Sequence, residues 1–138
     1  MEANFHILNI YNSIEEFGKV HNPVLTTGTF DGVHIGHQKL LSRIRNIAKK
    51  TNGESVLLTF HPHPRLVLFP ADTKLELITT QKEKLSLLEK EGIDHLIIHP
   101  FTKDFSRISS VDFVRGILVN KIGVKKLVIG YNHHFGRN

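Results

Sequence analysis

The chain has 138 residues, of which 40% are apolar and 22% charged, which suits one globular domain with a substantial core. It contains no cysteine, so disulfides and thiolate metal sites are excluded. No apolar stretch approaches the roughly 18 residues of a membrane span, and the start, MEANFHILNIYNS, lacks the pattern of a signal peptide. We therefore expect a cytoplasmic protein without a membrane partner. The net charge of +5 favours anionic partners such as nucleotides, phosphorylated metabolites or nucleic acid.

The first half of the chain predicts three strands and one helix. FHILNI at 5–10 is a candidate edge strand, whereas VLTTGTF at 24–30 and SVLLTF at 55–60 are typical of strands buried on both faces of a parallel sheet. Between these two, HQKLLSRIRNIAKK has apolar residues at helical spacing. They are Leu40, Ile44, Ile47 and Ala48. HPHPRLVLFPADTKLELI at 61–78 holds three prolines and predicts an irregular connection.

The second half alternates helix and strand. TTQKEKLSLLEKEG at 79–92 predicts a helix, HLIIHP at 95–100 a strand, and KLVIGY at 126–131 another strand. SSVDFVRGILVNKIG predicts a helix that starts at Ser109 and ends at Gly123. In the helix predicted at 79–92, Lys82, Lys84 and Lys90 are expected to lie on the face exposed to solvent. The alternation predicts one α/β domain over residues 1–138, with a doubly wound parallel sheet.

Seven of the ten histidines fall at the ends of the predicted strands or in the segments that follow them. They are His34, His37, His61, His63, His99, His133 and His134. Ligands of open parallel sheets bind beyond the carboxyl ends of the strands. The sequence therefore predicts an active site at this edge of the sheet.

The segment TTGTFDGVHIGHQ joins a predicted strand to a predicted helix. Gly28 and Gly32 allow the backbone to turn and to approach a ligand closely. His37 lies near the start of the helix, where free amide groups attract phosphate, and His34 precedes it by three residues. The pattern favours a cradle for an anion, in which the imidazoles donate hydrogen bonds to phosphate. The alternative is that both histidines only stabilise a turn.

The segment TFDGVHIGHQKLL strongly resembles the signature of the HIGH-motif nucleotidyltransferases. The resemblance is specifically to the FMN adenylyltransferase (FAD synthetase) module of bacterial bifunctional riboflavin kinase/FMN adenylyltransferases. The segments TFHPHPRLVL, LITTQKEKLSLLEKEGIDHLIIHPF, FVRGIL and LVIGYNHHFGR follow in the family's order. The resemblance implies a Rossmann-like fold and a reaction in which ATP and FMN, with Mg²⁺, give FAD and pyrophosphate.

The resemblance also implies two groups of binding residues. Those of the ATP site are Gly28, Phe30, Asp31, Gly32, His34 and His37. Those of the FMN site are Pro62, His63, Pro64, Thr79, Asn132 and Phe135. Among them, His34, His37 and Asn132 are expected to act in catalysis.

The family continues beyond FGR to a motif rich in serine, which also contacts ATP, and then to a riboflavin kinase domain. Because this sequence stops at Asn138, we expect a C-terminally truncated fragment whose own turnover is weak. Two alternatives keep the phosphate cradle: a non-catalytic nucleotide-binding module, and another HIGH-motif nucleotidylyltransferase. A metal-dependent hydrolase would use the HPH at 61–63 as ligands, but carboxylates are scarce in these loops. Nucleic acid is not expected as a partner, since the basic residues are spread over several helices.

Overall fold

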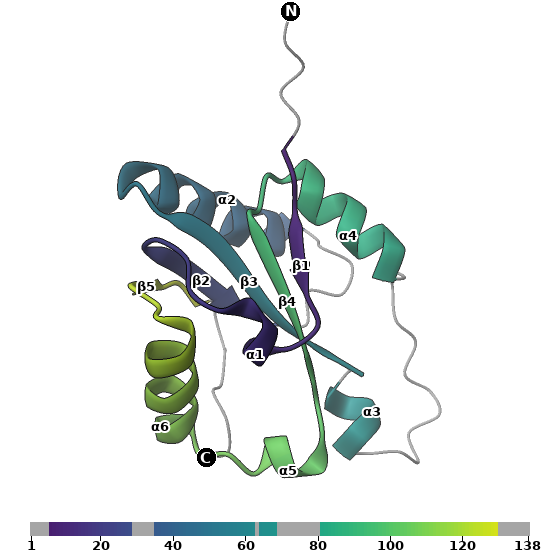
Figure 1. Cartoon of the computed structure of the whole chain (residues 1–138). Coiled ribbons are helices and arrows are strands. Elements are labelled where there is room, and N and C mark those ends of the chain that lie inside the picture. The colour runs from purple at the N-terminus through teal and green to yellow at the C-terminus, as the bar shows by residue number, and fades with distance from the viewer. Residues whose placement is uncertain (1–5, 29–34, 63, 69–80, 130–138) are drawn as a thin grey trace, which may run out of the picture.

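Five strands form one parallel sheet in the computed structural model, which describes residues 6–28, 35–62, 64–68 and 81–129 (Figure 1). Every pairing between neighbouring strands is parallel, and the order across the sheet is β1-β4-β3-β2-β5. The strands are β1 (Asn9–Tyr11), β2 (Pro23–Thr27), β3 (Glu54–His61), β4 (His95–Pro100) and β5 (Lys126–Leu127). This arrangement confirms the predicted α/β fold with a parallel sheet.

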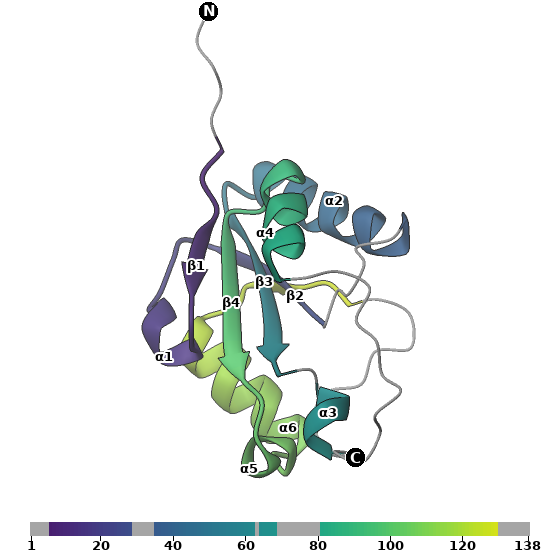
Figure 2. The same cartoon turned by 90° about the vertical axis from the view of Figure 1, so that its right-hand side faces the viewer.

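Helices cover both faces of the sheet (Figures 1 and 2). One face carries α2 (Ile35–Lys50) and α4 (Gln81–Lys90). The other carries the short α1 (Ile14–Phe17) and the long helix that begins as α6 (Ser110–Asp112) and continues as the π-helix η1 (Phe113–Ile122). Two further short helices, α3 (Pro64–Leu68) and α5 (Lys103–Ser106), lie beyond the ends of β3 and β4. None of the described helices is long and apolar enough to cross a membrane.

The two cores follow from the alternation of side chains along buried strands. Val24, Leu57 and Leu96 are buried against α2 and α4, where Leu41, Ile44 and Leu88 meet them. The residues next to these in the strands point the other way, toward α1 and η1. They are Leu25, Val56, Leu58 and Ile97, and they pack with Phe17, Phe113 and Leu118. Strands that are apolar on both faces require this sandwich of helices.

Most predicted elements are present, with shifted ends. The strand at 95–100 has the predicted bounds, whereas the helix predicted from residue 37 begins at Ile35. Ser109 accepts a hydrogen bond from the amide of Asp112, as its position predicted, and the helix ends at Gly123 with φ of 79°. The short helices α1 and α5 were not predicted.

Two expectations were wrong, one drawn from the prolines at 61–78 and one from the helical pattern at 79–92. The connection at 61–78 contains a short helix, α3, because Pro64 suits the first helical position. Lys84 is only 9% exposed, although it was expected on the solvated face with Lys82 and Lys90, which are exposed. The angular position on a helix does not reveal what lies over that part of its surface.

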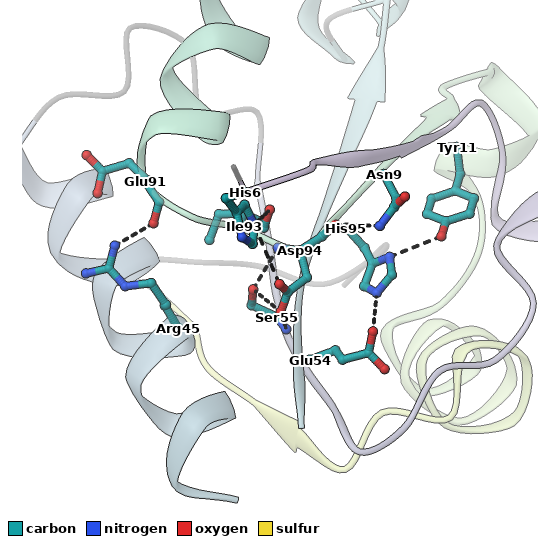
Figure 3. A network of polar contacts seen from close by, with 10 residues as sticks. All are labelled: His6, Asn9, Tyr11, Arg45, Glu54, Ser55, Glu91, Ile93, Asp94 and His95. Atoms are coloured by element: carbon teal, nitrogen blue, oxygen red, sulfur yellow. Dashed lines mark hydrogen bonds and ion pairs between the residues drawn. The ribbon is translucent and has the colours of Figure 1, made fainter. Parts of the chain in front are cut away.

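A network of hydrogen bonds connects the strands at their amino ends (Figure 3). The Asp94 carboxylate accepts hydrogen bonds from the backbone amide of Ser55 at 2.9 Å and from its hydroxyl at 3.1 Å. The amide of Asp94 donates in return to the Ser55 hydroxyl oxygen at 2.9 Å. His6 donates from Nε2 to the carbonyl of Ile93 at 2.7 Å. These bonds join the chain before β1 to the starts of β3 and β4.

His95 occupies the centre of a second part of this network (Figure 3). It is 5% exposed, its Nε2 donates to the Glu54 carboxylate at 2.8 Å, and its Nδ1 lies 3.1 Å from the Tyr11 hydroxyl. The hydrogen bond from His95 lowers the pKa of Glu54, and burial raises the pKa of Tyr11. His95 is therefore fully engaged in structural contacts.

His99 holds α1 against the sheet. Its Nδ1 accepts a hydrogen bond from the backbone amide of Ile14 at 3.0 Å, and its ring packs on Phe105 with centroids 4.9 Å apart. Burial lowers the pKa of His99 from the usual 6.5, an effect that the carboxylate of Glu15 opposes. Because only a deprotonated Nδ1 can accept from Ile14, this contact requires the neutral ring.

We predict that His99 makes the protein less stable as the pH falls below about 6.5. The unfolded chain binds a proton on this imidazole at a higher pH than the folded chain does, so acidification favours unfolding. His99→Asn, which keeps a neutral acceptor, should weaken the dependence of the free energy of unfolding on pH between about pH 7 and about pH 5. Urea unfolding of both proteins measures this. An unchanged pH dependence would show that His99 does not titrate in this way.

Candidate active site at the carboxyl edge of the sheet

The order in which successive strands are placed across the sheet reverses at β2. Along the chain, β2, β3 and β4 follow one another across the sheet, whereas β5 lies on the other side of β2. The backbone beyond β5 still runs beside β2, since the amide of Val128 donates to the carbonyl of Leu25 at 2.9 Å. In open α/β sheets, the crevice at such a switch point binds ligands. The carboxyl end of β2 is therefore the first place to look for a site.

The chain leaves β2 at this point and enters α2. The amide of Gly28 donates to the carbonyl of Leu58 at 3.1 Å, so the strand remains attached to β3 as far as this glycine. The helix starts at Ile35, and half-buried His37 is its third residue. The first turn of α2 contains no acidic side chain, and the first amide groups of a helix have no acceptor within the helix itself. This junction can hold an anion such as phosphate.

Four of the predicted site residues lie within the described part of the chain, and all four are at this edge. Gly28 and His37 flank the junction of β2 and α2, exposed Pro62 follows β3, and Pro64 starts α3. The peptide bond between His61 and Pro62 is cis. The other predicted residues lie outside the described residues. They are Phe30, Asp31, Gly32, His34, His63, Thr79, Asn132 and Phe135.

A group of phenylalanines lies at the same edge, beside Pro62. We call it the aromatic cluster; it consists of Phe60, Phe101, Phe105 and Phe113. The ring of Phe60 lies 5.7 Å from that of Phe101 and 5.3 Å from that of Phe105, measured between centroids. The amide of Phe101 donates to the carbonyl of His61 at 3.1 Å, which fixes it next to the turn at Pro62. The half-buried rings of the cluster offer an apolar surface to a flat aromatic ligand.

Sequence reasoning missed this cluster as a site feature. Phe113 is buried, whereas Phe60 is half-buried. The signal was present in the chain, because β3 carries Phe60 near its end and the segment after β4 carries Phe101 and Phe105. Only the pairing of β3 with β4 shows that these segments meet, since His61 lies opposite Pro100.

The expected gathering of histidines is only partly reproduced among the described residues. His37 and the exposed His61 lie at the carboxyl edge, but His99 lies within β4 and is engaged by the amide of Ile14. His63, His133 and His134, like His34, lie outside the described residues. Over the described ranges, no group of three or more His, Cys, Asp or Glu side chains could hold a metal ion.

Comparisons with known proteins agree with the geometry. The family model described as FAD synthetase matches residues 18–138. A bifunctional riboflavin kinase/FMN adenylyltransferase of Buchnera aphidicola subsp. Schizaphis graminum is 35% identical over 130 residues, which cover 94% of this chain and 41% of that protein. The protein of the same name from Escherichia coli strain K12 is 35% identical over 113 residues, covering 82% of this chain and 36% of its own length.

A solved structure supports the fold. The crystal structure named Macrolide-efflux Protein from Streptococcus pneumoniae aligns with a TM-score of 0.83 at 26% identity, covering 94% of this chain and 50% of that one. The chain thus spans about two fifths of the length of the curated relatives it matches. The family model covers most of the sequence, including both sides of the junction between β2 and α2. The chain belongs to the FAD synthetase family.

Proposed function

We propose that this chain is the adenylyl-transfer domain of a cytoplasmic, bifunctional enzyme of flavin cofactor synthesis, with ATP and FMN as substrates and FAD and pyrophosphate as products. The observation that carries the proposal is the junction of β2 and α2. Gly28 and His37 flank a phosphate-binding pattern at the switch point of the sheet, in a member of the FAD synthetase family. Riboflavin kinase activity is named in the relatives and would belong to another part of the full protein.

The reaction needs positioning and charge stabilisation rather than a protein nucleophile. A phosphate oxygen of FMN, already anionic near neutral pH, attacks the α-phosphorus of ATP. The bond from that phosphorus to the bridging oxygen breaks, and pyrophosphate leaves with the electron pair. Negative charge grows on the leaving group, where donors at the start of a helix act most effectively. No proton has to be removed from the nucleophile, so no general base is required.

The proposed roles of individual residues follow from the resemblance to the FAD synthetase family. His37 and the first amides of α2 hold the phosphates of ATP, together with His34 and the segment Phe30–Gly32. Asn132 approaches the reacting phosphates. The magnesium ion enters with ATP as part of the substrate.

The aromatic cluster supports a flavin as the acceptor. The isoalloxazine ring is flat and has an apolar dimethylbenzene end, and such rings pack on phenylalanine through offset and edge-to-face contacts. Pro62 follows β3, the neighbour of β2, and Phe101 lies beside it after β4, one strand further from the junction of β2 and α2. We propose that the flavin lies over these two residues, with Pro64, His63, Thr79 and Phe135 as further contacts, and places its phosphate toward α2.

We predict that the full gene product transfers the adenylyl group of labelled ATP to FMN. His37→Ala should lower kcat about a hundredfold, because one donor to the developing charge is lost. Chromatography of FAD together with a pyrophosphate assay measures both. His21→Ala removes an exposed imidazole at the amino edge and is the matched control, expected to leave kcat unchanged. ATP binding without FAD formation by the unaltered protein would contradict the proposal, as would full activity of the His37 variant.

We predict that Phe101→Ala raises the KM for FMN roughly fivefold, since an aromatic contact with a flat ring contributes on the order of 1 kcal/mol. The KM for ATP should change less than about twofold, which makes ATP an internal control in the same assay. Thermal unfolding checks that the variant remains folded. Equal increases of both KM values would show that Phe101 supports the fold and does not contact the flavin.

A further inference from the structure

The helix α2 has an unusual distribution of charge. Its sixteen residues include five cations and no aspartate or glutamate. The cations are Lys39, Arg43, Arg45, Lys49 and Lys50. One of them has a structural task, because Arg45 donates to the carbonyl of Glu91 at 2.5 Å and to the Ser42 hydroxyl at 3.1 Å. The other four are exposed, and none of the ion pairs found among the described residues involves them.

Three of these cations lie on one face of the helix. Lys39, Arg43 and Lys50 are separated by four and seven residues, a spacing that aligns side chains along a helix. We call this set the cation stripe. At the rise of an α-helix, its members lie about 6, 12 and 22 Å from the start of α2. The stripe therefore leads along the helix to the proposed phosphate site.

The other helices of the described chain do not show an excess of this size. In α4, exposed Lys82 and Lys90 are accompanied by exposed Glu83 and Glu89. On the opposite face of the sheet, Glu15 of α1 lies 3.7 Å from the Lys121 ammonium. Helix η1 has two cations, Arg115 and Lys121, and no acidic residue. With five cations and no acidic residue, α2 therefore carries the largest unbalanced positive charge among the described helices.

Helix stability explains only part of the pattern. Lys49 and Lys50 lie in the last turn, where cations stabilise a helix through its dipole. Lys39 and Arg43 lie outside that turn, so the dipole does not account for them. Repulsion between neighbouring cations on one face also opposes helix formation.

We propose that the cation stripe steers the phosphate-bearing substrates, ATP and FMN, toward the start of α2. The inference rests on the proposed function, because it takes these two anions as the ligands. A surface potential of one sign beside a binding site raises association rates by tenfold or more when salt is low. The Debye length is about 30 Å at 0.01 M ionic strength and about 8 Å at 0.15 M, so all three cations act on the site only in dilute salt.

Small anions fit this surface better than a nucleic acid does. Over residues 37–50 of α2, the exposed side chains are Gln38, Lys39, Arg43, Asn46, Lys49 and Lys50, none of which is aromatic. Proteins that hold single-stranded nucleic acid combine basic grooves with aromatic side chains on which the bases stack. The stripe has the charge for phosphate but no surface for bases.

The experiment compares two double variants of the full gene product with equal changes of net charge. Arg43→Glu/Lys50→Glu reverses two members of the stripe and leaves His37 in place. Lys19→Glu/Arg115→Glu reverses two exposed cations away from α2 and is the matched control. Stopped-flow fluorescence of FMN, and of a fluorescent ATP analogue, gives association and dissociation rates as a function of salt concentration.

The stripe variant should associate roughly five- to tenfold more slowly than the unaltered protein at about 0.01 M salt, and less than about twofold more slowly at about 0.5 M. Its dissociation rates and kcat should be unchanged, and the control should lose much less. Three results would overturn the inference: equal association rates, an equal loss in the control, or a loss that persists in high salt. A fourth result would overturn it as well: slower association of a fluorescent single-stranded DNA, measured in the same way, with unchanged association of FMN and the ATP analogue. If the unaltered protein makes no FAD, the proposed function fails by itself, whereas the association rates still test the stripe.

Discussion

The hydrogen bonds between Asp94 and Ser55 fix how β3 and β4 lie against each other, and the carboxyl edge of the sheet depends on that register. One carboxylate binds both the amide and the hydroxyl of Ser55, and the Ser55 hydroxyl oxygen accepts from the amide of Asp94. Shifting the strands by one residue would break all three bonds and would exchange the two apolar faces of each strand. With this register, His61 lies opposite Pro100, so the turn at Pro62 meets Phe101. An interaction at one end of the strands thus determines which side chains meet at the other end.

The two edges of the sheet differ in how their polar groups are used. At the amino edge, His6, His95 and Asp94 form hydrogen bonds within the protein (Figure 3). These contacts join the starts of the strands and leave the side chains engaged. At the carboxyl edge, the described residues present a glycine at the end of β2, the first turn of α2 and an apolar aromatic cluster. Such an edge suits a ligand with a phosphate group and a flat ring system.

The sequence predicted the kind of fold well, because its signals are local. Short apolar runs alternating with helical patterns indicated a doubly wound parallel sheet, and the strand at 95–100 was placed correctly. The short helices α1 and α5 were missed, since four residues are too few to show a helical period. Lys84 was misplaced because burial of a helix face depends on which segment covers it. The order of the strands also requires contacts between distant parts of the chain.

The candidate site was predictable to a similar extent. The position of Gly28 and His37 between a strand and a helix indicated a phosphate site from the sequence alone. His99 was grouped with the loop histidines, since nothing local reveals that its ring accepts a hydrogen bond from Ile14, 85 positions away. The rings of the aromatic cluster come from β3, the segment after β4, α5 and η1. The cluster therefore forms only when these elements fold together. A pattern along the chain can thus indicate single site residues, but a surface shared by several elements needs the tertiary structure.

The central claim is that ATP binds where β2 meets α2. The most direct test is a nuclear magnetic resonance titration of protein labelled with ¹⁵N in histidine and glycine, with ATP and magnesium added stepwise. The account predicts that the His37 ring and the Gly28 amide shift with a common dissociation constant, whereas His6 and His95 at the opposite edge do not. Shifts confined to His6 and His95, or saturable ATP binding that leaves His37 and Gly28 unchanged, would contradict it.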